Sequence, residues 1–183
     1  MSDRAGTLTD GDRIWLDRFM MPLPRGGTIL DLGCGGGEPV ARYLIDHGFR
    51  ILGIDTSETL IDLARLRFPH DRWIVGDMRN VAIDEQFAGV LAWNCLSHLP
   101  RADQGAMAER AASWMQDGAR LLFNAQVPDQ EAMDGFRTGS RYHADLAPAD
   151  YSGALATQGL VEMAHVEHDS ACGGAGVWLA RKL

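Results

Sequence analysis

Five short apolar segments alternate with helical patterns along the N-terminal part of the chain. This alternation is typical of βαβ units, because parallel strands need a crossover connection that is usually a helix. We therefore expect an α/β fold with a Rossmann-like, mostly parallel sheet and helices on both of its faces. The predicted strands are Thr28–Leu32, Arg50–Ile54, Arg72–Val75, Phe87–Trp93 and Ala119–Ala125.

The C-terminal part of the chain follows a different pattern. Leu160–His168 and Gly176–Lys182 are predicted to be strands, joined by the glycine-rich segment Cys172–Gly176. A connection this short predicts an antiparallel hairpin, which would complete a seven-stranded sheet. Neither a repeat nor a linker divides the sequence, so we expect a single domain over residues 1–183.

Helix boundaries are indicated by residues that cap or interrupt helices. Pro39 stands where the first residue of a helix is expected. Ser57 is predicted to cap a second helix, and Asp103 a third that ends near Gly118. Pro148–Gln158 is predicted to form a further helix before the hairpin.

Composition limits the partners and the compartment. The formal net charge of −8 argues against a broad grip on nucleic acid, which needs clustered cations. No apolar stretch is long enough to span a membrane, and no signal-peptide core follows the N-terminus, so a cytoplasmic protein is expected. Cys34, Cys95 and Cys172 lack Cys-x-x-Cys spacing, which speaks against a disulfide framework or a zinc site. A monomer and a homodimer are both compatible with the sequence.

A glycine-rich loop follows the first predicted strand. Asp31 is followed by Gly33, Gly35 and Gly37. Glycines let a ligand approach the backbone closely and permit positive φ angles. Asp55 ends the second predicted strand, where an acid can accept hydrogen bonds from both ribose hydroxyls of an adenosine. The loop and Asp55 together predict a site for a ligand that contains adenosine.

The spacing of the glycines separates two classes of ligand. A dinucleotide-binding loop would have glycine or alanine at position 38, but Glu38 stands there, and its carboxylate would repel a pyrophosphate. The pattern acid-x-Gly-x-Gly-x-Gly is complete from Asp31 to Gly37, and an acid at that place suits a ligand with a positive amino-acid head. No Gly-Lys-Ser/Thr follows, which excludes a phosphate-binding Walker loop.

On these residues the sequence resembles the class I S-adenosylmethionine-dependent methyltransferases. Ile29–Pro39 resembles their first motif, and Gly53–Ser57 resembles the end of their second strand. Gly76–Met78 is similar to their third motif, in which the acid meets the adenine amino group and its neighbour packs on the ring. Phe87–Pro100 resembles the fourth motif. The resemblance implies a site for S-adenosylmethionine and its product S-adenosylhomocysteine, with cofactor contacts from Asp31, Gly33, Cys34, Gly35, Gly37, Asp55, Thr56, Asp77, Met78 and Asn94.

The same resemblance limits the class of compound that can accept the methyl group. The fourth motif reads Trp93–Leu96, and not the Asn/Asp-Pro-Pro-Tyr/Phe of enzymes that methylate amino groups of nucleobases or glutamine. No acid ends the fourth strand, unlike the metal-dependent catechol type, so no metal is expected. The acceptor is expected to be a small molecule, and its reacting atom can be oxygen, nitrogen, carbon or sulfur.

Residues on the acceptor side are predicted from their position along the chain. His98 follows the fourth strand, where it can act as a base or serve only in packing. The segment 126–147 is long for an ordered connection, and such loops are often functional. We interpret it as a lid that faces the substrate, with His143 as a second candidate base and with Arg137, Arg141 and Tyr142 as candidate substrate contacts.

Two alternatives to a methyltransferase remain at this stage. A nicotinamide-dependent oxidoreductase would use a similar sheet, although Glu38 speaks against it. A non-catalytic domain that binds S-adenosylmethionine as a sensor or scaffold would keep the glycine loop and lack a substrate pocket.

Overall fold

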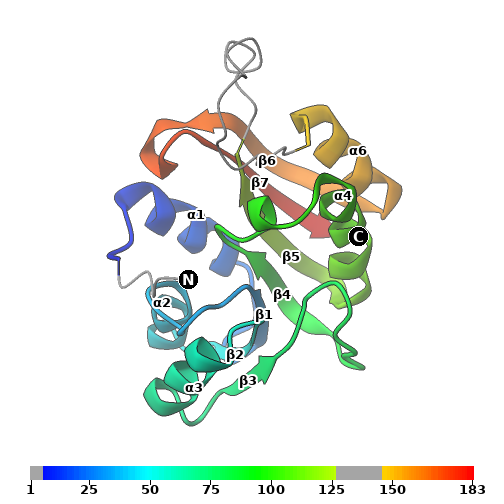
Figure 1. The fold of residues 1–183 in the computed structure, drawn as a ribbon. Coiled ribbons are helices and arrows are strands. Elements are labelled where there is room, and N and C mark those ends of the chain that lie inside the picture. The colour runs from blue at the N-terminus through cyan, green and yellow to red at the C-terminus, as the bar shows by residue number, and fades with distance from the viewer. Residues whose placement is uncertain (1–5, 127–145) are drawn as a thin grey trace, which may run out of the picture.

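The computed structural model describes residues 6–126 and 146–183. Within these ranges the chain forms a seven-stranded sheet in the order β3-β2-β1-β4-β5-β7-β6 (Figure 1). The first five strands pair in parallel, whereas β7 pairs antiparallel with both β5 and β6. This confirms the predicted fold class. The strands are β1 (Thr28–Leu32), β2 (Arg50–Asp55), β3 (Arg72–Val75), β4 (Phe87–Ala92), β5 (Met115–Ala125), β6 (Leu160–Asp169) and β7 (Ala175–Lys182).

Helices cover both faces of the sheet (Figure 1). Side chains from α1, α2 and α3 pack with one set of strand residues, and side chains from α4 and α6 pack with the other set. None of the helices in the described ranges has the length and apolar character needed to cross a membrane. The helices are α1 (Asp10–Met20), α2 (Val40–Asp46), α3 (Glu58–Arg67), α4 (Arg101–Ser113) and α6 (Pro148–Thr157), with short 3-10 turns η1 (Leu96–His98) and η2 (Ser170–Cys172).

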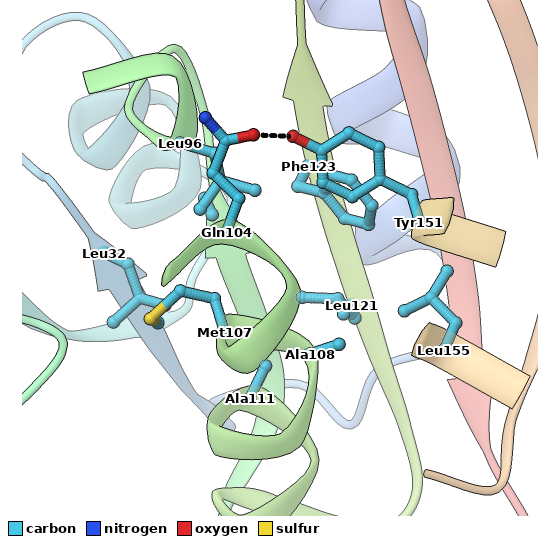
Figure 2. Close-up of a pocket in the computed structure, with 11 residues that line it drawn as sticks. Leu32, Leu96, Gln104, Met107, Ala108, Ala111, Leu121, Phe123, Tyr151 and Leu155 are labelled. Atoms are coloured by element: carbon cyan, nitrogen blue, oxygen red, sulfur yellow. Dashed lines mark hydrogen bonds between the residues drawn. The ribbon is translucent and has the colours of Figure 1, made fainter. Parts of the chain in front are cut away.

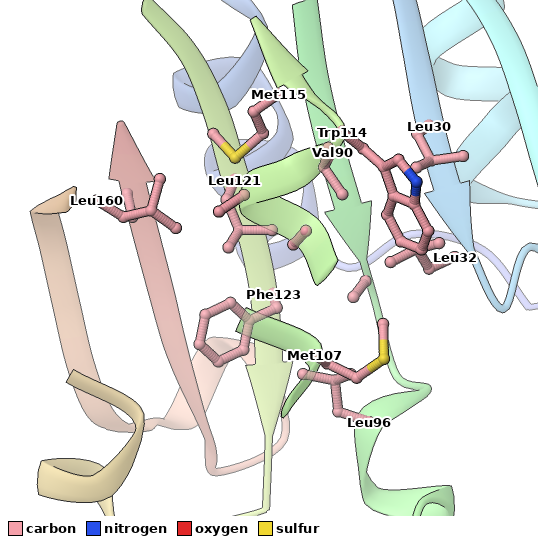
Figure 3. Packing of buried hydrophobic residues seen from close by; sticks show 14 of the residues in the cluster. Leu30, Leu32, Val90, Leu96, Met107, Trp114, Met115, Leu121, Phe123 and Leu160 are labelled. Atoms are coloured by element: carbon pink, nitrogen blue, oxygen red, sulfur yellow. The ribbon is translucent and has the colours of Figure 1, made fainter. Parts of the chain in front are cut away.

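Strand β1 illustrates how the two cores divide. Successive side chains of a strand point to opposite faces of the sheet. Ile29 accordingly packs with the α1–α3 side, whereas Leu30 and Leu32 pack with the α4–α6 side. Figure 3 shows the second cluster, in which Met107 of α4 lies against the strands. Asp31 therefore shares the face of Ile29, at the carboxyl end of the sheet.

The β3–β4 connection, residues 76–86, contains no helix. Its apolar side chains, including Met78 and Val81, pack against the α4–α6 core instead. Arg110 of α4 fixes this connection by donating hydrogen bonds to the carbonyl oxygens of Met78 (2.9 Å) and Val81 (2.7 Å). The predicted third motif is thus tied to a helix on the far side of the sheet from α1.

Several element boundaries agree with the sequence analysis. β1 and β3 have the predicted limits, and the Ser57 hydroxyl caps α3 by accepting a hydrogen bond from the Leu60 N–H (3.4 Å). Pro39 precedes α2 as its N-cap and is not its first residue. Such differences of one residue are usual at helix ends.

The boundaries of α4 were predicted wrongly at both ends. The helix begins at Arg101 after Pro100, and Asp103 lies in its first turn, where its carboxylate pairs with Arg79 (2.7 Å). The helix ends at Ser113, so Gly118 belongs to β5 and has a φ of +79° there. Glycine with positive φ ends helices and also forms strand irregularities, and the β4–β5 pairing is interrupted at this place.

Candidate cofactor site

The loop after β1 has three glycines with positive φ: Gly33 (+70°), Gly35 (+56°) and Gly37 (+80°). A Cβ on Gly33 would lie 2.5 Å from the Cβ of Cys95, and one on Gly37 would lie 2.6 Å from the Phe68 ring. A Cβ on Gly35 would have no atom within 4 Å. Gly33 and Gly37 are therefore needed for packing, whereas Gly35 leaves an open stretch of backbone that a ligand can approach.

Asp55 holds this loop against the start of α3. The carboxylate is almost buried, at 7% exposure, and its Oδ2 accepts a hydrogen bond from the Gly35 N–H (3.0 Å). Its Oδ1 accepts one from the Ser57 N–H (2.9 Å). Each carboxylate oxygen can accept more than one hydrogen bond. Asp55 can therefore position the loop and still accept hydrogen bonds from ribose hydroxyls.

Asp31 lies beside Asp55 in a different environment. It is only 3% exposed, and its Oδ2 has no hydrogen-bond partner among the described residues. Burial and, to a smaller extent, the negative charge of Asp55 raise the pKa of Asp31 to about 7. A buried carboxyl oxygen without a partner is costly, and a cationic ligand group would satisfy it.

The two cysteines near these carboxyls are not nucleophiles at neutral pH. Cys34 and Cys95 are buried, and burial is the main reason that the pKa of each thiol is raised. The charges of Asp31 and Asp55 act in the same direction. A thiol that stays protonated reacts poorly, so the predicted contribution of Cys34 is confined to its backbone.

In the predicted third motif, Asp77 is paired with a residue that the sequence analysis missed. Arg79 donates to both oxygens of Asp77, at 3.0 Å from Nε and 2.6 Å from Nη2. This hydrogen bonding lowers the pKa of Asp77 below its ordinary value. Met78 lies next to the glycine loop, since its Cε is 3.6 Å from the place where a Gly33 Cβ would be. The spacing Asp77-x-Arg79 was the available signal for the ion pair.

The chain after β4 lies against the glycine loop through Cys95. Asn94, just before it, has a φ of +55° and is exposed. Its backbone N–H donates to Oδ1 of Asn124 (2.5 Å), and Nδ2 of Asn124 donates to Oδ1 of Asn94 (2.8 Å). The sequence analysis missed Asn124, although an amide in the apolar end of β5 was a usable signal.

The structure brings together only part of the predicted site. Asp31, the glycine loop, Asp55, Met78 and Asn94 meet at the carboxyl ends of β1, β2 and β4, and Thr56 is exposed next to Asp55. His98 is exposed in η1. Arg137, Arg141, Tyr142 and His143 lie outside the described residues, as does most of the predicted lid. Within residues 6–126 and 146–183, no three His, Cys, Asp or Glu side chains gather as a metal-ligand set.

A small apolar cavity lies between α4 and α6 (Figure 2). Its volume is about 20 Å³, and a hydrogen bond from the Tyr151 hydroxyl to Oε1 of Gln104 (2.7 Å) closes one end. A cavity of this size holds about one water molecule. None of the predicted cofactor residues lines it. We therefore regard it as a packing gap beneath the site.

Residues 29–118 match the family described as "Methyltransferase domain". Two curated relatives extend the similarity. The chain is 29% identical over 133 residues to 27-O-demethylrifamycin SV methyltransferase from Amycolatopsis mediterranei, covering 65% of this chain and 46% of that protein. It is 29% identical over 129 residues to a ubiquinone biosynthesis O-methyltransferase from Coxiella burnetii, covering 68% and 54%.

Over residues 29–118 the chain is thus similar to a family of methyltransferases, and its fold is that of S-adenosylmethionine-dependent members. This confirms the resemblance seen in the sequence. The chain spans about half the length of these curated relatives. Its fold is similar to that of S-adenosylmethionine-bound CalS10, an amino pentose methyltransferase from Micromonospora echinaspora, with a TM-score of 0.74 and 19% identity over 99% of this chain and 94% of that one.

The residues of the methyltransferase suit the cofactor of its family. S-adenosylmethionine has an ammonium group, a ribose and an adenine. Oδ2 of Asp31, which has no hydrogen-bond partner among the described residues, suits the ammonium group. The two accepting oxygens of Asp55 suit the pair of ribose hydroxyls. The open backbone at Gly35 allows a close approach of the ligand.

Proposed function

We propose that this methyltransferase transfers a methyl group from S-adenosylmethionine to a small-molecule acceptor and needs no metal ion. The observation that carries the proposal is Asp31, a buried carboxyl whose Oδ2 has no partner among the described residues. It lies beside Asp55, which holds the backbone of Gly35, where a Cβ would meet open space. These features support a ligand with a cationic amino-acid head and an adenosine.

The cofactor contacts follow from this arrangement. Asp31 accepts from the ammonium group, the backbone of Gly33, Cys34, Gly35 and Gly37 lies along the ligand, and Asp55 with Thr56 faces the ribose. Asp77 and Met78 flank the adenine. Arg79 already donates four hydrogen bonds to the Asp77 carboxylate, one from its backbone N–H and three from its guanidinium. Because a carboxylate accepts about four hydrogen bonds, the adenine amino group would take the place of one of them. Asn94 contacts the cofactor through its main chain.

The bound cofactor supplies a methyl group already activated by the positive sulfur. The protein therefore acts mainly by binding, by alignment and by exclusion of water. For a hydroxyl acceptor, an oxygen lone pair forms the new C–O bond, the electron pair of the C–S bond stays on sulfur, and the hydroxyl proton leaves. His98 or His143 accepts that proton, while Arg137, Arg141 and Tyr142 hold the acceptor. An acceptor that is already ionised needs no base.

Calorimetry with S-adenosylhomocysteine tests the cofactor site. Wild type should bind it, and Asp31→Asn should weaken binding about tenfold or more, since a charge-assisted hydrogen bond is lost. Asp62→Asn is the matched control, because Asp62 is exposed on α3 and pairs only with Arg65 among the described residues. Binding of NADP in place of S-adenosylhomocysteine would overturn the proposal in favour of an oxidoreductase.

Transfer of a radiolabelled methyl group to a panel of small metabolites tests the activity. The names of the curated relatives, both O-methyltransferases, support beginning with phenols and alcohols. Methylation of at least one compound is expected. Tight binding of S-adenosylhomocysteine without transfer to any compound would favour a non-catalytic binding domain.

We further propose that residues 1–183 form one domain, that the protein acts in the cytoplasm, and that it does not bind nucleic acid. The net charge of −8 supports the last point. Whether it is a monomer or a homodimer is answered by sedimentation of the purified protein.

A further inference from the structure

Asn94 combines an unfavourable backbone with an exposed side chain. It is the one non-glycine residue with positive φ in the described ranges, and it lies at the end of β4 beside Cys95, which touches the glycine loop. The left-handed region disfavours residues with a Cβ, although asparagine tolerates it better than most. Glycine would adopt this conformation without strain. A non-glycine residue in this conformation is a sign that its side chain has a role.

The hydrogen bonds around Asn94 determine which of its amide atoms faces outward. A backbone N–H can only donate, so the atom of Asn124 that meets the Asn94 N–H must be its oxygen. Nδ2 of Asn124 therefore faces Asn94 and must meet an acceptor, which is Oδ1 of Asn94. This leaves Nδ2 of Asn94 directed away from the pair. Nothing in the described part of the chain accepts a hydrogen bond from it.

Asn124 is well placed to keep the Asn94 amide in this orientation. It is 3% exposed, and it lies in the central strand β5, opposite Val177 of β7. The oxygen and the nitrogen of its side-chain amide both form hydrogen bonds with Asn94. The amide therefore cannot rotate without losing two hydrogen bonds. The buried amide thus fixes the orientation of the exposed one.

We propose that Nδ2 of Asn94 donates a hydrogen bond to an oxygen of the methyl acceptor, and that the acceptor is therefore an oxygen nucleophile and not an amine. This inference rests on the proposed function. A hydroxyl or phenolate oxygen has one lone pair for the attack on the methyl group and another to accept from Asn94. A neutral amine has a single lone pair, which it needs for the new C–N bond, and its N–H groups would face a donor.

In this step the oxygen lone pair forms the C–O bond and the C–S bonding pair remains on sulfur. The hydroxyl proton leaves to a base or to water, and Asn94 neither gains nor loses a proton. Asn94 acts by directing one lone pair of the oxygen, which leaves the other free for the methyl carbon. This role differs from the cofactor contact that the resemblance implied for Asn94.

Three substitutions test both the presence of the Asn94 side chain and the orientation of its amide. Asn94→Gly removes the amide while suiting the positive φ. Asn124→Asp keeps an oxygen for the Asn94 N–H but replaces the donor that faces Asn94, so the Asn94 amide should rotate and present Oδ1 outward. Asn94→Asp also places an oxygen outward and serves as a second variant should Asn124→Asp fold poorly. Gln158→Glu, at the residue that follows α6, is the control for the added charge.

The measurement uses labelled methyl transfer to matched pairs of acceptors that differ only by hydroxyl or amine, such as a phenol and the corresponding aniline. Wild type should prefer the hydroxyl member. Asn94→Gly should lower kcat/KM on it by roughly tenfold to 100-fold while S-adenosylhomocysteine binds as in wild type. Asn124→Asp and Asn94→Asp should shift the preference toward the amine, whereas Gln158→Glu should not.

A wild-type preference for amines, or full activity of Asn94→Gly on the hydroxyl acceptor, would overturn the inference and leave the proposed function intact. Failure of wild type to bind S-adenosylhomocysteine would overturn the proposed function itself. If no pair is turned over, nuclear magnetic resonance of the Asn94 side-chain amide in the S-adenosylhomocysteine complex decides. A shift on addition of phenol and not of aniline supports the inference, and any other response contradicts it.

Discussion

Asp31 and Asp55 are two carboxyls on one face of neighbouring strands, yet their surroundings differ. Both oxygens of Asp55 accept backbone hydrogen bonds, whereas Oδ2 of Asp31 has no partner in the described part of the chain. Burial therefore acts on Asp31 without compensation, and its pKa is raised to about 7. The residue that suits the ammonium group of the cofactor is the one whose charge the unliganded fold disfavours.

The unliganded protein should lose stability with rising pH because of Asp31. An acid whose pKa is higher in the folded than in the unfolded chain binds its proton more tightly when folded. The free energy of unfolding should thus fall as the pH rises from about 4 to about 7, by about 2–3 kcal/mol between pH 5 and pH 8. Urea denaturation at both pH values checks this. Asp31→Asn should lack this part of the pH dependence; an equal fall in the variant would assign it to other groups.

Substitution of Asp55 should affect both binding and stability. Asp55→Asn replaces one accepting oxygen by a donor, which opposes the N–H of Gly35 or Ser57. We expect S-adenosylhomocysteine affinity to fall roughly tenfold to 150-fold and the free energy of unfolding to fall by about 1–3 kcal/mol. Calorimetry and urea denaturation measure the two effects. Ser57→Ala is the control, since it removes the cap of α3 and spares the carboxylate; equal losses of affinity in both variants would contradict a ribose contact.

How far single residues could be predicted depends on how local their signal is. Asp31, the glycines and Asp55 follow from spacing along the chain, because they lie at or directly after the carboxyl ends of β1 and β2. Asn124 depends on the pairing of β4 with β5, and the ion pair of Arg79 with Asp103 depends on how the β3–β4 connection meets α4. Such contacts arise only in the folded chain, and spacing carries little information about them.

Among the elements, the strand bounds were predicted to within one residue, except for the start of β5. Apolar runs such as Arg72–Val75 mark the strands directly. The sequence predicts that a helix ends near Gly118, whereas Gly118 lies in β5, because a glycine with positive φ can end a helix or interrupt a strand. The consequence is a β5 of eleven residues, whose first residue Met115 pairs with Phe87 of β4.

The gap between α4 and α6 should accept extra carbon atoms. Ala108 lines it from α4 (Figure 2). Ala106 of the same helix is exposed. Valine costs either position about 0.5 kcal/mol in helix propensity, but at 108 it buries two carbons worth about 0.8 kcal/mol each. Ala108→Val should therefore be about 1–1.5 kcal/mol more stable than Ala106→Val in urea denaturation. A less stable Ala108→Val would mean that the gap cannot be filled.

At the scale of the whole molecule, the single sheet predicts single-step unfolding. The two apolar cores share every strand from β1 to β5, so neither half should melt alone. Tryptophan fluorescence and far-ultraviolet circular dichroism should give the same urea midpoint. Separate midpoints for these two signals would contradict a single domain.

S-adenosylhomocysteine at one hundred times its Kd should stabilise the fold by about 2.7 kcal/mol.

The position of β7 between β5 and β6 has a consequence during synthesis. β5 ends at Ala125 and β7 begins only at Ala175. At a translation rate of about 5–20 residues per second, the edge of β5 therefore stays without its partner strand for several seconds. β6 is made first, yet it carries exposed charges such as Glu162 and Glu167, whereas Val177, Trp178 and Leu179 of β7 are buried. A strand covered on both faces must be apolar on both. The side chains of the two strands, and not the order in which the ribosome makes them, therefore determine which one pairs with β5.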